Sequence, residues 1–220
     1  MTADLPESLA GAWQPHATHA DELTVLFASI SAETTVFEPV ETTPLEAALA
    51  SELPVRSLFV VELSFSPPLP SLGVSPASVH SKAVSRATDQ LVSLLTDAGV
   101  IVDGVRERLE FEAPNGKPGT WSVVDVRYPI ADGRSVDATN GTDDADPIRA
   151  EAHVAVWPGE RTFGVAGGTL PLERPDRFRT NTAAVSDGRS DENRTVEIDP
   201  ERDRETVSTL ISDIDLDADQ

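Results

Sequence analysis

One long amphipathic segment between strand-like segments constrains the fold of this chain most. Ser75 and Pro76 supply an N-cap and a first helical residue, and Gly99 ends the segment as a C-terminal glycine does. Lys82 and Arg86 lie on its polar face. The apolar face consists of Val79, Ala83, Ala87, Leu91, Leu94, Leu95 and Ala98. A helix of about five to six turns is long enough to cover one face of a sheet.

Segments rich in β-branched and aromatic residues predict strands on both sides of this helix. Residues 55–65 are almost all apolar, which is typical of a strand in the centre of a sheet. After the helix, residues 100–112 and 120–130 are expected to pair as antiparallel strands around a turn at PNGKPG. Nearer the N-terminus, a turn at PHATHADE precedes predicted strands over 23–29 and 34–40, with a hairpin at ISAE.

Capping signals predict two further helices. Thr43, Pro44 and Glu46 form a capping box ahead of LEAALASEL, and Asp199 with Pro200 can begin a C-terminal helix. The apolar stripe of that last helix is Val207, Leu210, Ile211 and Ile214. A short helix is also expected over 6–13. The fold class is therefore predicted to be α+β, an antiparallel sheet covered by helices.

Three glycines in the segment RTFGVAGGTLPL raise the question of a phosphate-binding loop. Such loops place their glycines between a strand and a helix, whereas Gly164, Gly167 and Gly168 lie within a strand-like segment. A tight turn at Pro158-Gly159-Glu160 joins it to the preceding strand. The pattern predicts a hairpin whose glycines allow a neighbouring strand or helix to approach closely.

The chain is expected to form one core domain with less regular additions. The polar insertion and the long loop are assigned as flexible because they have no sustained apolar period. The predicted parts are an N-terminal segment 1–22, a core 23–175 with an acidic insertion at 131–147, a flexible loop 176–198, a closing helix 199–214 packed on the core and a disordered tail 215–220.

The charge balance is strongly acidic, with 38 Asp and Glu against 17 Lys and Arg and a net charge of −21. At molar salt the Debye length falls to about 3 Å, so this self-repulsion is screened. We therefore interpret the acidity as salt adaptation, with a cationic partner as the alternative. Direct binding to nucleic acid is not expected, because no basic stripe is present. Within the sheet, charges of 100–112 are expected to pair with Asp125 and Arg127.

Cysteine is absent from the sequence, which excludes disulfides and Cys-ligated zinc. The first residues lack the basic and apolar regions of a secretory signal, and the longest apolar stretch is far shorter than the roughly 20 residues that span a bilayer. A cytoplasmic protein without a membrane partner is expected. No cofactor is predicted.

Two groups of polar residues are candidate sites. His16, His19 and Asp21 can together offer ligands to a divalent ion, although a His pair alone lacks the four ligands of a structural zinc site. The alternative is a ligand-binding group at one end of the sheet, formed by residues far apart in the sequence: Arg127, Glu151 and His153. No catalytic residues are assigned, because the sequence contains no recognisable nucleophile motif.

The order of these elements resembles the PsbP-like α/β sandwich fold over roughly residues 23 to 214, and the composition resembles haloarchaeal proteins of unknown function. The resemblance implies a small accessory or binding protein rather than an enzyme. The first functional hypothesis is therefore a non-enzymatic accessory protein that acts on an unknown protein partner. The alternative is a small-ligand-binding protein or an enzyme whose site is assembled from scattered polar residues.

Overall fold

The computed structural model describes residues 5–25, 28–41, 45–131, 147–173 and 198–214. Its strands are β1 (Trp13–Val25), β2 (Ala28–Pro39), β3 (Ser57–Ser66), β4 (Ile101–Glu112), β5 (Pro118–Tyr128), β6 (Ile148–Pro158) and β7 (Phe163–Pro171). Within the described residues they form one antiparallel sheet in the order β1-β2-β3-β7-β6-β5-β4. The predicted central strand is β3, which pairs with β2 on one side and β7 on the other.

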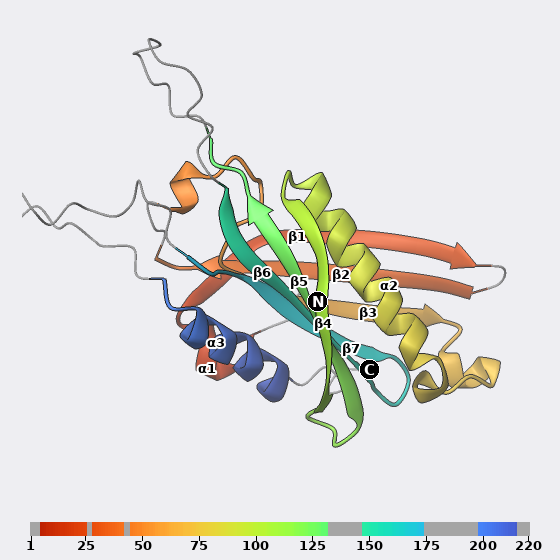
Figure 1. Ribbon diagram of the computed structural model, residues 1–220. Coiled ribbons are helices and arrows are strands. Elements are labelled where there is room, and N and C mark those ends of the chain that lie inside the picture. The colour runs from red at the N-terminus through yellow and green to blue at the C-terminus, as the bar shows by residue number, and fades with distance from the viewer. Residues whose placement is uncertain (1–4, 26–27, 42–44, 132–146, 174–197, 215–220) are drawn as a thin grey trace, which may run out of the picture.

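Helices cover both faces of the sheet. The long helix α2 (Pro76–Asp97) crosses one face, whereas α1 (Glu7–Ala10) and α3 (Pro200–Asp213) lie at the other (Figure 1). Two 3-10 turns, η1 (Glu46–Ala48) and η2 (Leu69–Leu72), lie in the connections. The α+β class is thus confirmed. None of the helices in the described part is long and apolar enough to cross a membrane.

The helix α2 has the predicted ends and packs on the sheet through one side. The side-chain oxygen of Ser75 accepts a hydrogen bond from the backbone N–H of Ser78 at 3.3 Å, which caps the first turn. Leu91 and Leu95 of α2 are buried in one cluster with Val124 of β5 and Val154 of β6. This cluster is the core of the α2 face.

A second core lies on the opposite face, under α3. Asp199 caps this helix by accepting a hydrogen bond from the backbone N–H of Arg202 at 3.1 Å. The predicted stripe of α3 is buried against side chains of β3, β6 and β7, such as Leu58 and Leu170. Because each face of the sheet has its own core, the sheet is the middle layer of three.

The glycine-rich segment is confirmed as a hairpin. Gly164, Gly167 and Gly168 all lie in β7, which pairs with β6 without a register shift. A Cβ added at Gly167 would collide with the backbone oxygen of His153 on β6, and one at Gly168 would collide with the backbone oxygen of Ser57 on β3 and lie 3.2 Å from Val207 on α3. The glycines therefore let β6, β3 and α3 approach β7 closely, as the sequence predicted.

The N-terminal predictions need correction. The stretch PHATHADE was expected to be a turn, but it lies inside β1, which pairs with β2 from Trp13–Pro39 to Val25–Ala28. ISAE lies within β2 and is not the hairpin connection. Pro15 is accommodated because β1 is an edge strand with a register shift between Pro15 and Ala17.

The helix predicted after Thr43 is also wrong in extent. Only the single 3-10 turn η1 forms, and the backbone is extended again at Leu49, which makes a β-bridge with Ile130. Thr43 and Pro44 themselves lie outside the described residues, as do nearly all of the predicted acidic insertion and loop, and the whole predicted tail.

Candidate functional site

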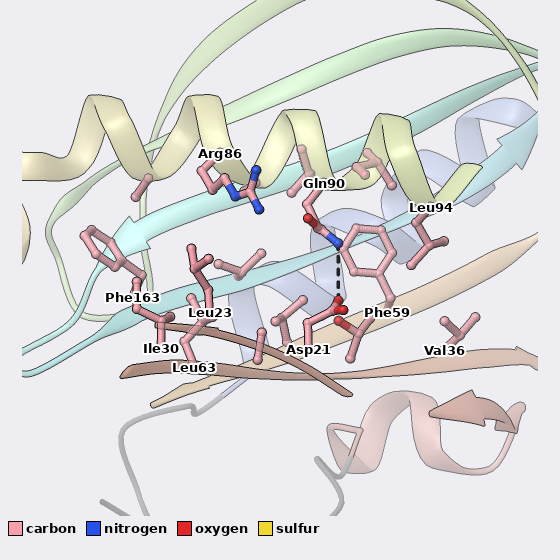
Figure 2. Close-up of a pocket in the computed structure, with 18 of the residues that line it drawn as sticks. Asp21, Leu23, Ile30, Val36, Phe59, Leu63, Arg86, Gln90, Leu94 and Phe163 are labelled. Atoms are coloured by element: carbon pink, nitrogen blue, oxygen red, sulfur yellow. Dashed lines mark hydrogen bonds between the residues drawn. The ribbon is translucent and has the colours of Figure 1, made fainter. Parts of the chain in front are cut away.

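A cavity of about 450 Å³ separates α2 from the β1–β3 half of the sheet (Figure 2). The cavity exists because α2 packs on the half of the sheet formed by β4 to β7 and contacts β6 most extensively. Side chains of β1, β2 and β3 form the opposite wall. We call this space the α2 cavity.

Apolar side chains form most of the lining of the α2 cavity, and the hydroxyl-bearing residues Thr34, Ser57 and Thr169 also line it. Its innermost part is built by buried residues of four strands and the helix: Val36, Phe59, Val154, Val165, Leu91 and Leu95. Leu23, Ile30, Leu63 and Phe65 extend the lining towards the end of the β1–β2 hairpin. An apolar space of this kind offers few hydrogen bonds to water.

Small side chains explain why this space is not filled. Ala83 and Ala87 on α2 and Ala32 on β2 all line the cavity. A leucine at these positions would extend into the space, whereas a methyl group leaves it open. The cavity thus follows from alanines on one face of α2, a pattern that in the sequence alone cannot be distinguished from ordinary close packing.

Polar side chains gather at the mouth of the cavity. Lys82, Arg86 and Gln90 follow one another at four-residue intervals along α2, so they lie on one side of the helix. The amide nitrogen of Gln90 donates a hydrogen bond to a carboxylate oxygen of Asp21 on β1 at 3.2 Å. Figure 2 shows Arg86 and Gln90 extending from α2, with Leu23 on the opposite wall. The mouth of the cavity is therefore bordered by the polar side of α2, and the interior below it is apolar.

The sequence-predicted ligand group is only partly assembled by the fold. Glu151 and His153 are two residues apart on β6 and share the α3 face of the sheet. Arg127 is not with them, because its guanidinium forms an exposed ion pair with Asp103 on β4 at 2.7 Å. That pair, together with Arg106 and Asp125, confirms the predicted cross-strand charges.

Glu151 is the buried centre of an ion cluster whose two arginines are partly exposed. Its carboxylate accepts hydrogen bonds from Arg106 of β4 at 2.7 Å and from two nitrogens of Arg204 of α3 at 2.9 Å. Nε2 of His153 lies 3.1 Å from the same carboxylate. Burial by itself would raise the pKa of Glu151, but the hydrogen bonds from His153, Arg204 and Arg106 hold that pKa well below its usual range.

The cluster is closed by an indole. Trp121 donates from Nε1 to Nδ1 of His153 at 3.0 Å, so Nε2 of a neutral imidazole carries the proton that Glu151 accepts. None of these residues lines the α2 cavity. The arrangement links β4, β5, β6 and α3 and favours a structural role.

The predicted metal-binding residues are spread along β1. Nδ1 of His16 lies 2.9 Å from a carboxylate oxygen of Glu38, and Asp21 is bound by Gln90 at the cavity mouth. His19 is exposed opposite Thr34. Among the described residues, no three His, Cys, Asp or Glu side chains are grouped closely enough to hold a metal ion.

The fold and the site together define a three-layer α+β protein with an apolar cavity under its long helix. The chain belongs to a family described as a domain of unknown function, DUF6517, whose profile matches residues 12–215. The match begins just before β1 and ends just after α3, so it covers the whole sheet and both of the longer helices. No curated protein and no solved structure matches the chain.

Proposed function

We propose that the protein binds a small apolar molecule in the α2 cavity. The observation that carries this proposal is a cavity of about 450 Å³ whose interior is lined mainly by apolar side chains. Sites for small molecules commonly occupy roughly 300–1,000 Å³ and combine an apolar lining with a few polar groups. The α2 cavity matches that description in volume and in chemistry.

Energetics favour an apolar occupant over water. Each methylene transferred from water into such a space gains about 0.8 kcal/mol. A ligand that buries about ten of them gains roughly 8 kcal/mol before the cost of association is subtracted. Among the described residues that line the cavity, the titratable ones, such as Asp21 and Lys82, lie at the mouth and not in the interior. This arrangement supports binding rather than chemical conversion.

The test is binding of the uncharged fluorescent probe N-phenyl-1-naphthylamine in molar KCl. Ala87→Phe places a ring in the cavity and should abolish the fluorescence increase, whereas Ser85→Phe, on the exposed side of α2, should leave it intact. Ala32→Phe blocks the space from the opposite wall and repeats the test should the first variant fold poorly. Undiminished probe binding by both cavity variants would overturn the proposal.

A second candidate function is an interaction with a protein partner through β4. This strand lies at the edge of the sheet and exposes Ile101, Val105 and Leu109, which are 42%, 42% and 49% exposed. An exposed edge strand with apolar side chains can accept a strand from another protein. Affinity purification in molar KCl tests it: a protein retained by the wild type and lost by Leu109→Asp supports this function, and recovery of the protein alone counts against it.

We also infer a salt-rich environment and a cytoplasmic location. The net charge of −21 supports the first, because such a surface repels itself in dilute buffer. We also propose a haloarchaeal origin, which the composition supports, and a PsbP-like arrangement, which the order of elements supports. An accessory role is compatible with either binding function.

A further inference from the structure

Two cations at the mouth of the α2 cavity have no partner among the residues that the structure describes. Lys82 and Arg86 are exposed, and neither forms an ion pair or a side-chain hydrogen bond with any other residue in the described part of the chain. In this they differ from Arg56, Arg106, Arg127 and Arg204, which are paired with carboxylates. We define Lys82 and Arg86 as the cationic pair.

The positions of the cationic pair on α2 place both side chains at the mouth of the cavity. The two residues are four apart on α2 and are therefore neighbours on one side of the helix. Gln90, a further four residues along, reaches β1 and bonds to Asp21. Since Gln90 shows that side chains in this row reach the opposite wall, the longer side chains of Lys82 and Arg86 can reach a group lying in the mouth (Figure 2).

Carboxylates also face the mouth, and their positions limit where an anion can sit. Asp21 and Glu22 on β1 are the acidic residues of the lining. Asp21 is opposite Gln90, and its carboxylate is already engaged there. Arg86 lies one turn before Gln90 on α2, above Leu23 and on the side of the mouth nearer Phe163, and Lys82 precedes Arg86 by a further turn. An anionic group has a favourable place there and an unfavourable one beside Asp21.

We propose that the ligand of the α2 cavity is a small anionic amphiphile, whose apolar body fills the cavity and whose carboxylate or phosphate is held by Lys82 and Arg86. This inference rests on the proposed function and adds the charge of the ligand. A guanidinium binds either oxyanion through two parallel hydrogen bonds, and an ammonium adds a second positive charge. Because the pair is exposed, the anion keeps part of its hydration and avoids the cost of burial.

The experiment compares two probes that share one ring system. N-phenyl-1-naphthylamine is uncharged, and 1-anilinonaphthalene-8-sulfonate carries an anionic group. The double variant Lys82→Gln/Arg86→Gln should raise the Kd of the sulfonate probe about fivefold and leave that of the uncharged probe unchanged. The control Arg108→Gln/Arg202→Gln removes the same charge from exposed positions that do not line the cavity and should change neither Kd.

The outcomes separate this inference from the proposed function. If the uncharged probe does not bind the wild type, the cavity proposal fails. If the uncharged probe binds but the control variant weakens the sulfonate probe as much as the double variant does, the cationic pair has no specific role. Competition against the bound probe with decanoate and decyl phosphate then shows whether the pair prefers a carboxylate or a phosphate. Decanol is the uncharged comparison. If decanol displaces the probe at the same concentration as the two anions do, the inference is overturned.

Discussion

Replacing Glu151 with glutamine should destabilise the protein far more than replacing an exposed charged residue with a neutral one. The side chain of Glu151 is 1% exposed and accepts hydrogen bonds from Arg106, Arg204 and His153. Glutamine keeps the size of the side chain but removes the negative charge. Two guanidinium groups then share a neutral amide, and one amide N–H of the new side chain faces donors only.

The size of the effect follows from the burial of each partner. Removing one member of a buried ion pair costs about 3–5 kcal/mol, because the remaining charge stays uncompensated. Here the side chains of Arg106 and Arg204 are 39% and 42% exposed, so water solvates part of their charge after the substitution. We therefore expect a loss near the lower limit, about 3 kcal/mol in the free energy of unfolding, which is a large share of the roughly 5–15 kcal/mol typical of a domain.

Urea unfolding in molar KCl, followed by circular dichroism, measures this loss. Asp103→Asn is the matched control, since Asp103 accepts from a guanidinium in the same sheet but is exposed. The control should lose much less stability, because water replaces its partner. Equal losses in the two variants would refute the reasoning that burial makes the Glu151 cluster important.

Acid provides a second readout of the same cluster. The pKa of Glu151 in the folded protein lies well below its ordinary value of 4.5, so the native state binds fewer protons than the unfolded state as the pH falls. The stabilisation is therefore complete above about pH 4.5 and declines below it. The stability difference between wild type and Glu151→Gln should shrink from neutral pH to about pH 3. A difference that does not change with pH would contradict this linkage.

Two further predictions concern packing and surface charge. Gly167→Ala should lower the free energy of unfolding in urea by about 3 kcal/mol, because the added Cβ collides with the backbone oxygen of His153, whereas Gly11→Ala meets no atom and should change stability little. Glu62→Gln should raise the melting temperature in dilute buffer and have no such effect in molar KCl, because Glu62 lies directly opposite Glu33 in the β2–β3 ladder and salt screens their repulsion. An unchanged melting temperature in dilute buffer would contradict the second.

The two longer helices could be predicted because their boundaries are encoded locally. Ser75 and Asp199 each cap a helix through a side-chain oxygen, and a proline follows each of them. The hairpin of β6 and β7 was also predictable, since strand-like segments flank a tight turn at Pro158-Gly159-Glu160. In these regions local propensity and tertiary packing agree.

The strand β1 could not be predicted, because it has almost no buried face. Most of its side chains, from Gln14 to Leu23, are exposed, so the apolar alternation that marks a strand is absent. Its structure depends on the pairing with β2, a tertiary interaction that leaves little trace in the strand's own sequence. The apolar residues near 23–29 suggested a strand that runs through what is in fact the end of the β1–β2 hairpin.

The candidate site was missed for a related reason. Ala83 and Ala87 were correctly assigned to the apolar face of the long helix, yet that pattern does not say whether a helix face packs on a sheet or borders a space. Lys82 and Arg86 were assigned to the polar face, where exposed cations are common. Only the lateral position of α2 over the sheet brings the alanines and the cations to one cavity.

The position of β1 at the edge of the sheet has a consequence for the rate at which a ligand exchanges. In the described structure β1 pairs within the sheet with β2 alone, so the outermost strand of the cavity wall is attached to the sheet on one side. Edge elements open locally at a lower free energy than the centre of a sheet. Within the hairpin, β2 stays paired with β3 and contributes Val36 and Phe37 to the two cores, so β1 is the strand that can move outwards once its side-chain contact with Gln90 is released. Exchange of the proposed ligand would then follow the local motion of one edge strand, on a timescale separate from that of unfolding.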